Sequence, residues 1–453
     1  MNFSKKTLII LFVAAMVVRL LALASFAEEK SLLYVSDSLT YLQVGKNLLT
    51  HGVYSMEISS TPHPDNFRTP LYPLFLIPFI WLKTSLYIPA LVQTVFMSLG
   101  ILLFFILSQK IFSRKEALIA SIFFALEPFT ALIGGQIMTE SIFVPLFVTS
   151  LLLFAIYIEK KDIRYALFGS LLLALSALTR PISFYLFVMI PLAVFFSERE
   201  KRIMIKHVFL SLAVFFTVVS PWLLFNAISL HTIQFSSVSD MQFYAYHGKY
   251  FDEWRHKHGA APEDKLEELS LDPINNTFNA RAIPPIKAVG VAYIKAHWPQ
   301  YGLYHILRIP SLYTDSGYAS ILNGIPFLHF NYDTVDGGFF DQLFSGHALD
   351  LIRTIPQQPV FLLLFLADLL FVLMAMLCFL NPVLYYVKYR KIPSHVLWLI
   401  LVLGMYTVLS SPIGGARFRI PINPILCILA INSLTVLRTW RTVTPSDISY
   451  DKS

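Results

Sequence analysis

The 453-residue chain is 56% hydrophobic and only 14% charged, and its mean hydropathy is +0.63. This composition leaves too little polar surface for a soluble globular protein, and it predicts a membrane protein that crosses the bilayer many times. The net charge of +7 comes from Lys and Arg residues that are scattered in twos and threes between apolar runs. Such scattering indicates membrane topology and argues against a nucleic-acid partner.

The first apolar run covers residues 7–27 and follows Lys5 and Lys6. Its small-residue ending resembles the cleavage site of a signal peptide. A run of about twenty residues, however, matches a full transmembrane helix better than the shorter apolar region of a signal peptide. We therefore expect a retained first helix.

Apolar runs of spanning length recur along the chain and predict an all-α fold with about ten transmembrane helices. A further apolar run at residues 70–82 is only about thirteen residues long and contains three prolines, so a crossing there would be strained. The ten predicted spans cover residues 7–27, 88–109, 116–135, 140–158, 163–179, 181–197, 205–228, 358–387, 394–411 and 419–437.

The positive-inside rule fixes the expected sidedness. Basic clusters precede the first span and follow the second, fourth, sixth, eighth and tenth, so all six lie on one side only if residues 70–82 do not cross. We therefore expect a juxtamembrane helix at 70–82 on the outer surface, both termini in the cytoplasm, and a multi-pass location in the inner or plasma membrane. The clusters are Lys5-Lys6, Lys110 to Lys115, Lys160 to Arg164, Arg199 to Lys206, Lys388 to Lys391 and Arg438 to Arg441.

This topology divides the chain into three parts. An N-terminal transmembrane region (1–228) includes a first outer loop (28–87), a large outer loop (229–357) follows, and a C-terminal transmembrane region with a short cytoplasmic tail (358–453) completes the chain. The large loop is long enough to form a folded layer, and residues 286–312 within it have near-helical spacing.

Four arginines break the sidedness pattern because they flank spans on the outer side. They are Arg68, Arg180, Arg417 and Arg419. Guanidinium groups bind phosphate through several donors, so we predict that these side chains hold the phosphate of a lipid substrate. The alternative is that they pair with acids or cap the carbonyl groups of helix ends.

Two acids accompany these arginines on the outer side. Asp37 lies just after the first span, and Glu140 lies where the third span turns into the fourth, with Thr139 as its expected helix cap. A transfer reaction to a hydroxyl group needs a carboxylate that accepts the proton and cations that stabilise the leaving phosphate. The alternative is that both acids only stabilise the N-termini of helices.

No nucleotide-binding glycine loop is visible, and the outer histidines have no recognised metal-ligand spacing. The sequence therefore predicts no cofactor, while a divalent metal ion stays open. The buried charges Arg19, Glu127 and Asp368 are expected to form structural ion pairs.

Several short motifs carry a family resemblance. They are Asp37 followed by Tyr41, Arg68-Thr-Pro-Leu-Tyr72-Pro, Thr139-Glu140, Thr179-Arg-Pro181 and Arg417-Phe-Arg-Ile-Pro421. In these motifs the chain resembles the membrane glycosyltransferases of the GT-C fold, within the bacterial branch related to protein O-mannosyltransferases and to the aminoarabinose transferase that modifies lipid A. The resemblance covers residues 1–230 and 355–440, and the large outer loop has no matching motif.

The resemblance implies an inverting transfer of a sugar from a polyprenyl-phosphate donor to a lipid, glycan or protein acceptor on the outer side. It implies a general-base role for Asp37 with help from Glu140, and contacts of Tyr41 and Tyr72 with substrate. The chain departs from the mannosyltransferase branch at Ser38, where that branch has a second acid. It also carries Arg68 where the lipid A enzymes have a lysine.

Two other functions use the same lipids. A transporter or flippase of lipid-linked sugars would need charges near the bilayer midplane and repeated, broken helices, whereas the charges here collect at one face. A lipid-linked polysaccharide polymerase or ligase would share the outer arginines but would not explain an acid placed directly after the first span. A structural or receptor role is a third alternative.

Overall fold

The computed structural model of the protein describes residues 5–26, 33–34, 36–259, 283–318 and 359–440. Every regular element within these ranges is helical, as the sequence predicts. Parts of the predicted large outer loop (260–282 and 319–357) and the C-terminal tail from residue 441 lie outside the described residues.

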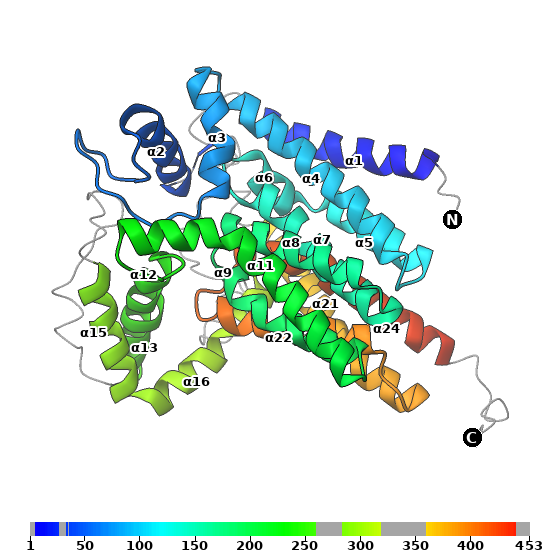
Figure 1. Ribbon diagram of the computed structural model, residues 1–453. Coiled ribbons are helices and arrows are strands. Elements are labelled where there is room, and N and C mark those ends of the chain that lie inside the picture. The colour runs from blue at the N-terminus through cyan, green and yellow to red at the C-terminus, as the bar shows by residue number, and fades with distance from the viewer. Residues whose placement is uncertain (1–4, 27–32, 35, 260–282, 319–358, 441–453) are drawn as a thin grey trace.

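Six of the described helical segments are long and apolar enough to cross a membrane. They give the molecule a bundle of long helices that run in roughly one direction (Figure 1). The segments are α1 (Lys5–Ala24), α4 (Tyr87–Ser108), α7 (Glu140–Lys160), α11 (Lys201–Ser229), α21 (Pro359–Tyr389), and Ala416–Thr439, which combines α23 (Ala416–Arg419), η6 (Ile420–Ile422) and most of α24 (Asn423–Trp440).

A bent pair, α5 (Arg114–Leu126) and α6 (Pro128–Gly135), gives a seventh candidate span with an angle of 51° at the break. The break occurs at Glu127 because a residue that precedes proline is pushed out of the helical region, and Glu127 is extended (φ −62°, ψ 115°). Its carboxylate then accepts hydrogen bonds from the backbone N–H groups of Phe129 (3.0 Å) and Thr130 (2.7 Å), which caps α6. Glu127 therefore acts as a helix cap, whereas an ion pair was expected for it.

Three shorter apolar segments coincide with the remaining predicted spans. They have 16 or 17 residues each, so the count of ten crossings stays a prediction. The segments are α8 (Ile163–Thr179), the consecutive helices α9 (Ile182–Tyr185), η2 (Leu186–Val188) and α10 (Met189–Ser197), and α22 (Ser394–Ser410).

The helix α3 (Leu71–Trp81) occupies the position of the expected juxtamembrane helix. It has only 11 residues, contains Pro78, and lies across the direction of α1 and α4 rather than along it (Figure 1). The OH group of Tyr72 donates a hydrogen bond to Gln93 Oε1 of α4 (2.9 Å), which anchors the short helix to the bundle.

The helix α7 lies in the centre of the bundle. Its spanning segment is 89% buried, compared with 22% for α1, and it packs against α4 and α8. Since α7 is surrounded by protein, a charge at its first residue, Glu140, is placed inside the molecule rather than in lipid.

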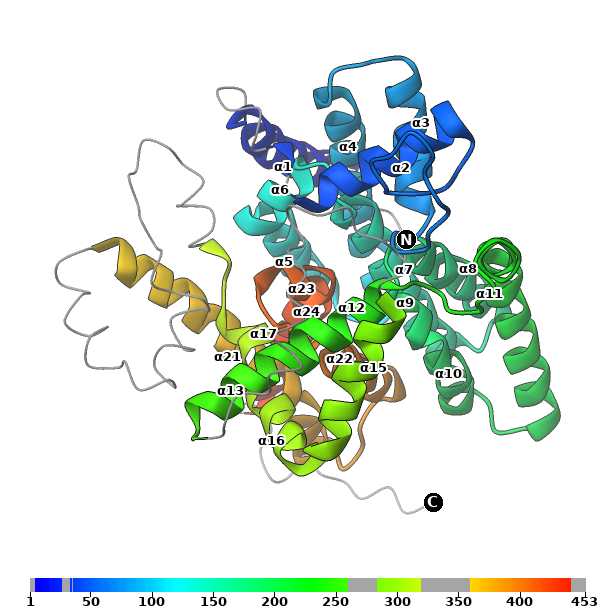
Figure 2. The ribbon, with the colours of Figure 1, turned by 90° about the vertical axis from the view of Figure 1, so that its left-hand side faces the viewer.

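A second layer of helices lies beyond one end of the bundle (Figures 1 and 2). An aromatic core joins four of these helices through Tyr244, Phe251, Tyr293 and Tyr304. The layer comprises α2 (Ser36–His51), α12 (Val238–Tyr244), the π-helical turn η3 (Ala245–Lys249), α13 (Tyr250–Lys257), α15 (Ile283–Ala296) and α16 (Trp298–Arg308), from which α17 (Ser311–Thr314) leads back into the bundle. Residues 286–312, expected to have helical spacing, form part of α15, α16 and α17.

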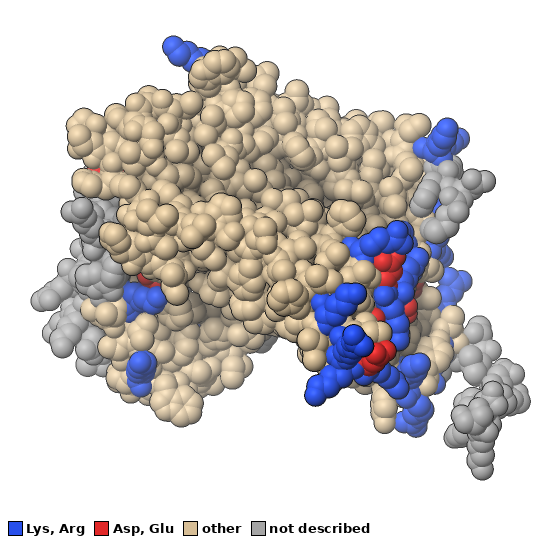
Figure 3. Space-filling view, in the orientation of Figure 1, with Lys and Arg blue, Asp and Glu red and all other residues tan. Residues whose placement is uncertain are grey.

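Charged side chains collect at the opposite end of the bundle, on the face that Figure 3 shows. Lys and Arg gather there near both ends of the chain, and the middle of the same face carries almost no charge (Figure 3). This distribution matches the basic clusters from which the sidedness was predicted.

Candidate active site

A cavity of ≈ 680 Å³ lies between the bundle and the second layer. Its volume is in the range of small-ligand sites, about 300–1,000 Å³. Segments far apart in the sequence line it: the first outer loop, the turn between α8 and α9, α12 with η3, α16, and the chain from the end of α22 into α23.

Asp37 and Arg68 are the two charged residues of the first outer loop that line the cavity. Asp37 lies in the first turn of α2, and Arg68 Nη2 donates to its Oδ1 at 2.6 Å. The backbone around Arg68 is fixed from two sides, because its carbonyl accepts from the OH group of Tyr54 (2.8 Å) and the carbonyl of Phe67 accepts from Ser236 Oγ (2.8 Å). The guanidinium group also donates to Thr40 Oγ1 at 2.8 Å, so Arg68 is held rigidly beside the acid.

Glu140 and Arg180 come from the bundle. Arg180 precedes Pro181, so its backbone is extended (φ −141°, ψ 128°), α8 ends there, and the side chain enters the cavity. Its Nη1 donates to Glu140 Oε1 at 2.8 Å, and the Glu140 side chain is fully buried. Thr139 makes no side-chain cap of α7, contrary to the expectation, because its hydroxyl donates to Glu140 Oε2 (3.2 Å).

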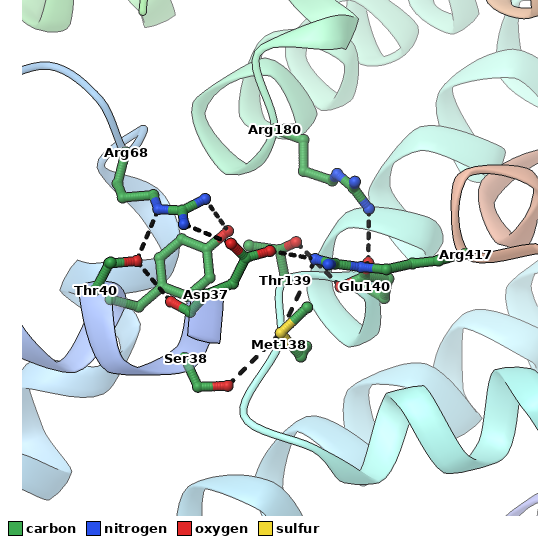
Figure 4. A network of polar contacts seen from close by, with 10 residues as sticks. Asp37, Ser38, Thr40, Arg68, Met138, Thr139, Glu140, Arg180 and Arg417 are labelled. Atoms are coloured by element: carbon green, nitrogen blue, oxygen red, sulfur yellow. Dashed lines mark hydrogen bonds and ion pairs between the residues drawn. The ribbon is translucent and has the colours of Figure 1, made fainter. Parts of the chain in front are cut away.

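Arg417 joins the two acids (Figure 4). Its Nε donates to Glu140 Oε1 at 2.7 Å, and its Nη2 donates to Asp37 Oδ2 at 2.8 Å. The turn before it requires glycine at Gly414, because φ is +63° and an added Cβ would lie 2.1 Å from Ser311 Oγ. The late Gly-Gly-Ala-Arg sequence thus brings a C-terminal arginine to an N-terminal acid.

These five residues form one arginine–carboxylate network, which consists of Asp37, Arg68, Glu140, Arg180 and Arg417 (Figure 4). Three guanidinium groups and two carboxylates leave a surplus of one positive charge beside the cavity. Burial by itself raises the pKa of the Asp37 carboxyl, but the charges and hydrogen bonds of Arg68 and Arg417 outweigh it and hold that pKa well below its usual range. Asp37 is therefore ionised at neutral pH.

The other three predicted site residues have different positions. Tyr41 lines the cavity, and the Arg68 guanidinium lies 4.7 Å from the centre of its ring. Tyr72 is fully buried behind Tyr41, with ring centroids 5.0 Å apart, and it does not line the cavity. Its position does not support the predicted substrate contact.

Arg419 is separate from the network. Its guanidinium donates to the carbonyl groups of Leu312 (3.0 Å) and Asp315 and lies 3.8 Å from the centre of the Phe371 ring. The side chain is 1% exposed and does not line the cavity. Arg419 joins the chain around α17 to the bundle, so its predicted place among the phosphate ligands has no support in the geometry.

The sequence did not predict the aromatic side of the cavity. We call this surface the aromatic wall and define it by Phe243, His247, Tyr301 and His305. His247 is one of the outer histidines, which have no recognised metal-ligand spacing in the sequence. No motif marks these positions, because the wall forms only when α12 and η3 pack beside α16.

No group of three or more His, Cys, Asp or Glu side chains converges within the described ranges. The two acids of the network converge on the Arg417 guanidinium, so a cation placed between them would meet a positive charge.

Comparisons with known proteins agree with the resemblance seen in the sequence. Residues 69–225 match the model of the family described as dolichyl-phosphate-mannose-protein mannosyltransferase. The matched part contains Glu140 and Arg180 but not Asp37, Arg68 or Arg417. No curated protein matches the chain.

Among solved structures, the archaeal oligosaccharyltransferase AglB from Archaeoglobus fulgidus, in complex with an inhibitory peptide and a dolichol-phosphate, matches with a TM-score of 0.50. The match has 16% sequence identity and covers 99% of this chain and 52% of that chain. The apo form of the oligosaccharyltransferase from the same organism also matches with a TM-score of 0.50, at 14% identity over 96% of this chain and 51% of that chain. The chain thus spans about half the length of these enzymes.

The helical fold and the family match together make the chain similar to the membrane glycosyltransferases of the GT-C class. Within that class, the matched segment relates the chain to the mannosyltransferase branch, as the motifs predicted.

Proposed function

We propose that the protein transfers a sugar from a polyprenyl-phosphate donor to an acceptor on the outer side of the membrane, with inversion at the anomeric carbon and Asp37 as the general base. The observation that carries this proposal is the surplus of one positive charge in the network beside the cavity. The phosphodiester of such a donor carries one negative charge, which balances the surplus.

Two further observations support a lipid-linked donor. The matching family is named for dolichyl-phosphate mannose, and the neighbour AglB was solved with a dolichol-phosphate. The second layer, which borders the cavity, lies at the end of the bundle away from the basic clusters (Figures 1 and 3), and we propose that this end faces the outside of the inner or plasma membrane.

In the proposed reaction, the acceptor oxygen forms a bond with the anomeric carbon while the bond from that carbon to the phosphate oxygen breaks. The electron pair of the broken bond leaves with the lipid phosphate, and the proton of the acceptor passes to the Asp37 carboxylate. Arg68, Arg180 and Arg417 stabilise the second negative charge that the phosphate gains. Glu140 orients two of these arginines.

In the proposed mechanism, the ion pairs of Asp37 couple the binding of the donor to the basicity of the Asp37 carboxylate. A carboxylate held by two guanidinium groups is a weak base. A phosphodiester that binds Arg68 and Arg417 weakens their hold on Asp37, and the basicity of the carboxylate rises as the donor arrives. The base is thus activated only when a donor is present.

The decisive assay follows the donor lipid. Purified protein is added to cell-envelope membranes with polyprenyl-phosphate mannose or polyprenyl-phosphate aminoarabinose, labelled in both the sugar and the lipid. We expect the label in the sugar to leave the lipid and sugar-free polyprenyl phosphate to accumulate. A flippase would move the donor intact across the membrane, and that result would overturn the proposal. Size analysis of the labelled product separates transfer of one sugar from polymerisation.

A second prediction concerns pH. The folded-state pKa of Asp37 lies below the usual value of about 3.9, so its ion pairs persist above that pH and weaken only as the pH falls through the lower folded-state value. In Arg68→Ala, one opposing cation is gone while burial still raises the pKa of Asp37. The acid limb of the kcat/KM profile should therefore move to higher pH.

Arg68→Lys is the matched control, because it keeps the charge and should keep the acid limb near that of the wild type. A profile of Arg68→Ala that superimposes on the wild-type profile would show that Asp37 is not the titrating base.

A further inference from the structure

The aromatic wall lines the same cavity as the arginine–carboxylate network but has a different chemistry. The rings of Phe243 and His247 are stacked, with centroids 4.8 Å apart and an angle of 26° between the planes. The His305 ring lies 6.1 Å from that of His247 at an angle of 29°. The His247 ring thus stacks with both of its neighbours and joins the three rings into one group that lines the cavity.

Hydrogen bonds fix the polar edges of the wall. The OH group of Tyr301 contacts His247 Nδ1 and lies 3.2 Å from His305 Nδ1, so one hydroxyl ties the two imidazoles together. The backbone behind the wall is also close-packed, because a Cβ at Gly290 of α15 would lie 2.8 Å from the carbonyl oxygen of Phe243. The wall is therefore built on rigid support.

Of the wall residues, Tyr301 also packs against the aromatic core of the second layer, whereas Phe243 lies outside that core. Tyr244 is 4% exposed and packs into that core, whereas its neighbour Phe243 is 37% exposed and lines the cavity. On α16, Tyr304 belongs to the core while Tyr301 and His305 line the cavity. Packing of the layer therefore holds Tyr301 in place but does not account for the exposed ring of Phe243, which faces the cavity.

The wall carries no net charge at neutral pH. Burial, together with the neighbouring His305, lowers the pKa of His247 to about 4, and burial also lowers the pKa of His305. A neutral imidazole and a phenol each offer hydrogen-bond donors and acceptors without attracting an ion. A phosphate would bind the guanidinium groups on the other side of the cavity, because they are positively charged. The neutral wall is complementary to an uncharged ligand.

We propose that the aromatic wall is a carbohydrate subsite, which stacks the apolar face of a neutral sugar ring and hydrogen-bonds its hydroxyl groups beside the arginine–carboxylate network. Ring faces with hydrogen-bonding edges match the two surfaces of a sugar. This inference rests on the proposed function. The sugar ring that the wall holds belongs either to the donor or to a saccharide acceptor. Both sugars have an apolar face and hydroxyl groups.

The test uses three probes with the purified full-length protein: polyprenyl phosphate, polyprenyl-phosphate mannose and methyl mannoside. Phe243→Ala removes the stacking face, and Tyr301→Phe removes only the hydroxyl that joins the imidazoles. Leu303→Ala is the matched control. Leu303 is on α16 with Tyr301, is 52% exposed and does not line the cavity.

We expect Phe243→Ala to weaken the binding of a sugar-bearing probe by about tenfold, with a smaller loss for Tyr301→Phe, while polyprenyl phosphate binds as in the wild type. A loss confined to polyprenyl-phosphate mannose assigns the wall to the donor sugar, and a loss confined to methyl mannoside assigns it to the acceptor. Unchanged binding of both sugar probes by Phe243→Ala overturns the subsite.

The same probes separate this inference from the function on which it rests. If the wild type does not bind polyprenyl phosphate, the proposed donor is wrong, whereas a loss of methyl mannoside affinity in Phe243→Ala still supports the wall. If polyprenyl phosphate binds and the wall variants behave like Leu303→Ala, only the subsite fails.

Discussion

Replacing Asp37 with Asn should lower the rate of sugar transfer by about 10²- to 10⁴-fold, the usual contribution of a general base. The amide has nearly the same shape and can still accept a hydrogen bond from Arg68 or Arg417, so the loop should keep its fold. Its neutral side chain cannot take the proton of the acceptor. The variant also raises the positive surplus of the network by one, so the donor should bind at least as tightly as in the wild type.

This separation of rate from affinity distinguishes a base from a structural acid. Steady-state kinetics should show a large loss in kcat with KM for the donor unchanged or lower, and binding of polyprenyl phosphate should be kept. Glu57→Gln is the matched control, since Glu57 is an acid of the same outer loop that does not line the cavity. An undiminished rate for Asp37→Asn rejects the assignment of Asp37 as base, and a loss of donor binding would give the acid a structural role.

The sequence predicted the candidate site best where local chemistry fixes the direction of a side chain. Arg180 could be assigned from the sequence because Pro181 ends α8 and leaves the arginine at the mouth of the bundle. Asp37 and Glu140 could be assigned because each lies next to the end of a predicted span, on the side opposite the basic clusters. In each case a strong local signal placed the residue.

The prediction was weaker where two residues of one type lie close together. Arg417 and Arg419 are two positions apart on the one-turn helix α23, so their side chains leave it about 200° apart, at 3.6 residues per turn. Arg417 therefore reaches Asp37 and Glu140, while Arg419 faces the chain around α17. The sequence shows both arginines but not which of them faces the cavity.

The aromatic wall was beyond the reach of sequence analysis for another reason. Phe243 and Tyr301 lie far apart in a loop without a recognised motif, and their neighbours Tyr244 and Tyr304 are equally aromatic. Only the packing of the second layer decides which rings become core and which line the cavity. A tertiary choice of this kind leaves no periodic signal in the sequence.

Replacing Glu140 with Gln should have the largest effect on stability. The Glu140 carboxylate is fully buried and accepts from both Arg180 (2.8 Å) and Arg417 (2.7 Å). Without its charge, one carboxylate remains for three guanidinium groups. Loss of one partner from a buried ion pair typically costs about 3–5 kcal/mol, so the purified variant should unfold at a clearly lower temperature than the wild type.

Addition of polyprenyl phosphate to Glu140→Gln should then test whether the network binds a phosphate. Polyprenyl phosphate supplies negative charge to the guanidinium groups, so it should raise the melting temperature of Glu140→Gln by more than it raises that of the wild type. The double variant Glu140→Gln with Arg180→Met removes one negative and one positive charge together. Its loss of stability should be smaller than the sum of the losses in the two single variants. If the losses simply add and the lipid stabilises both proteins equally, Glu140 does not hold the arginines in place for a phosphate.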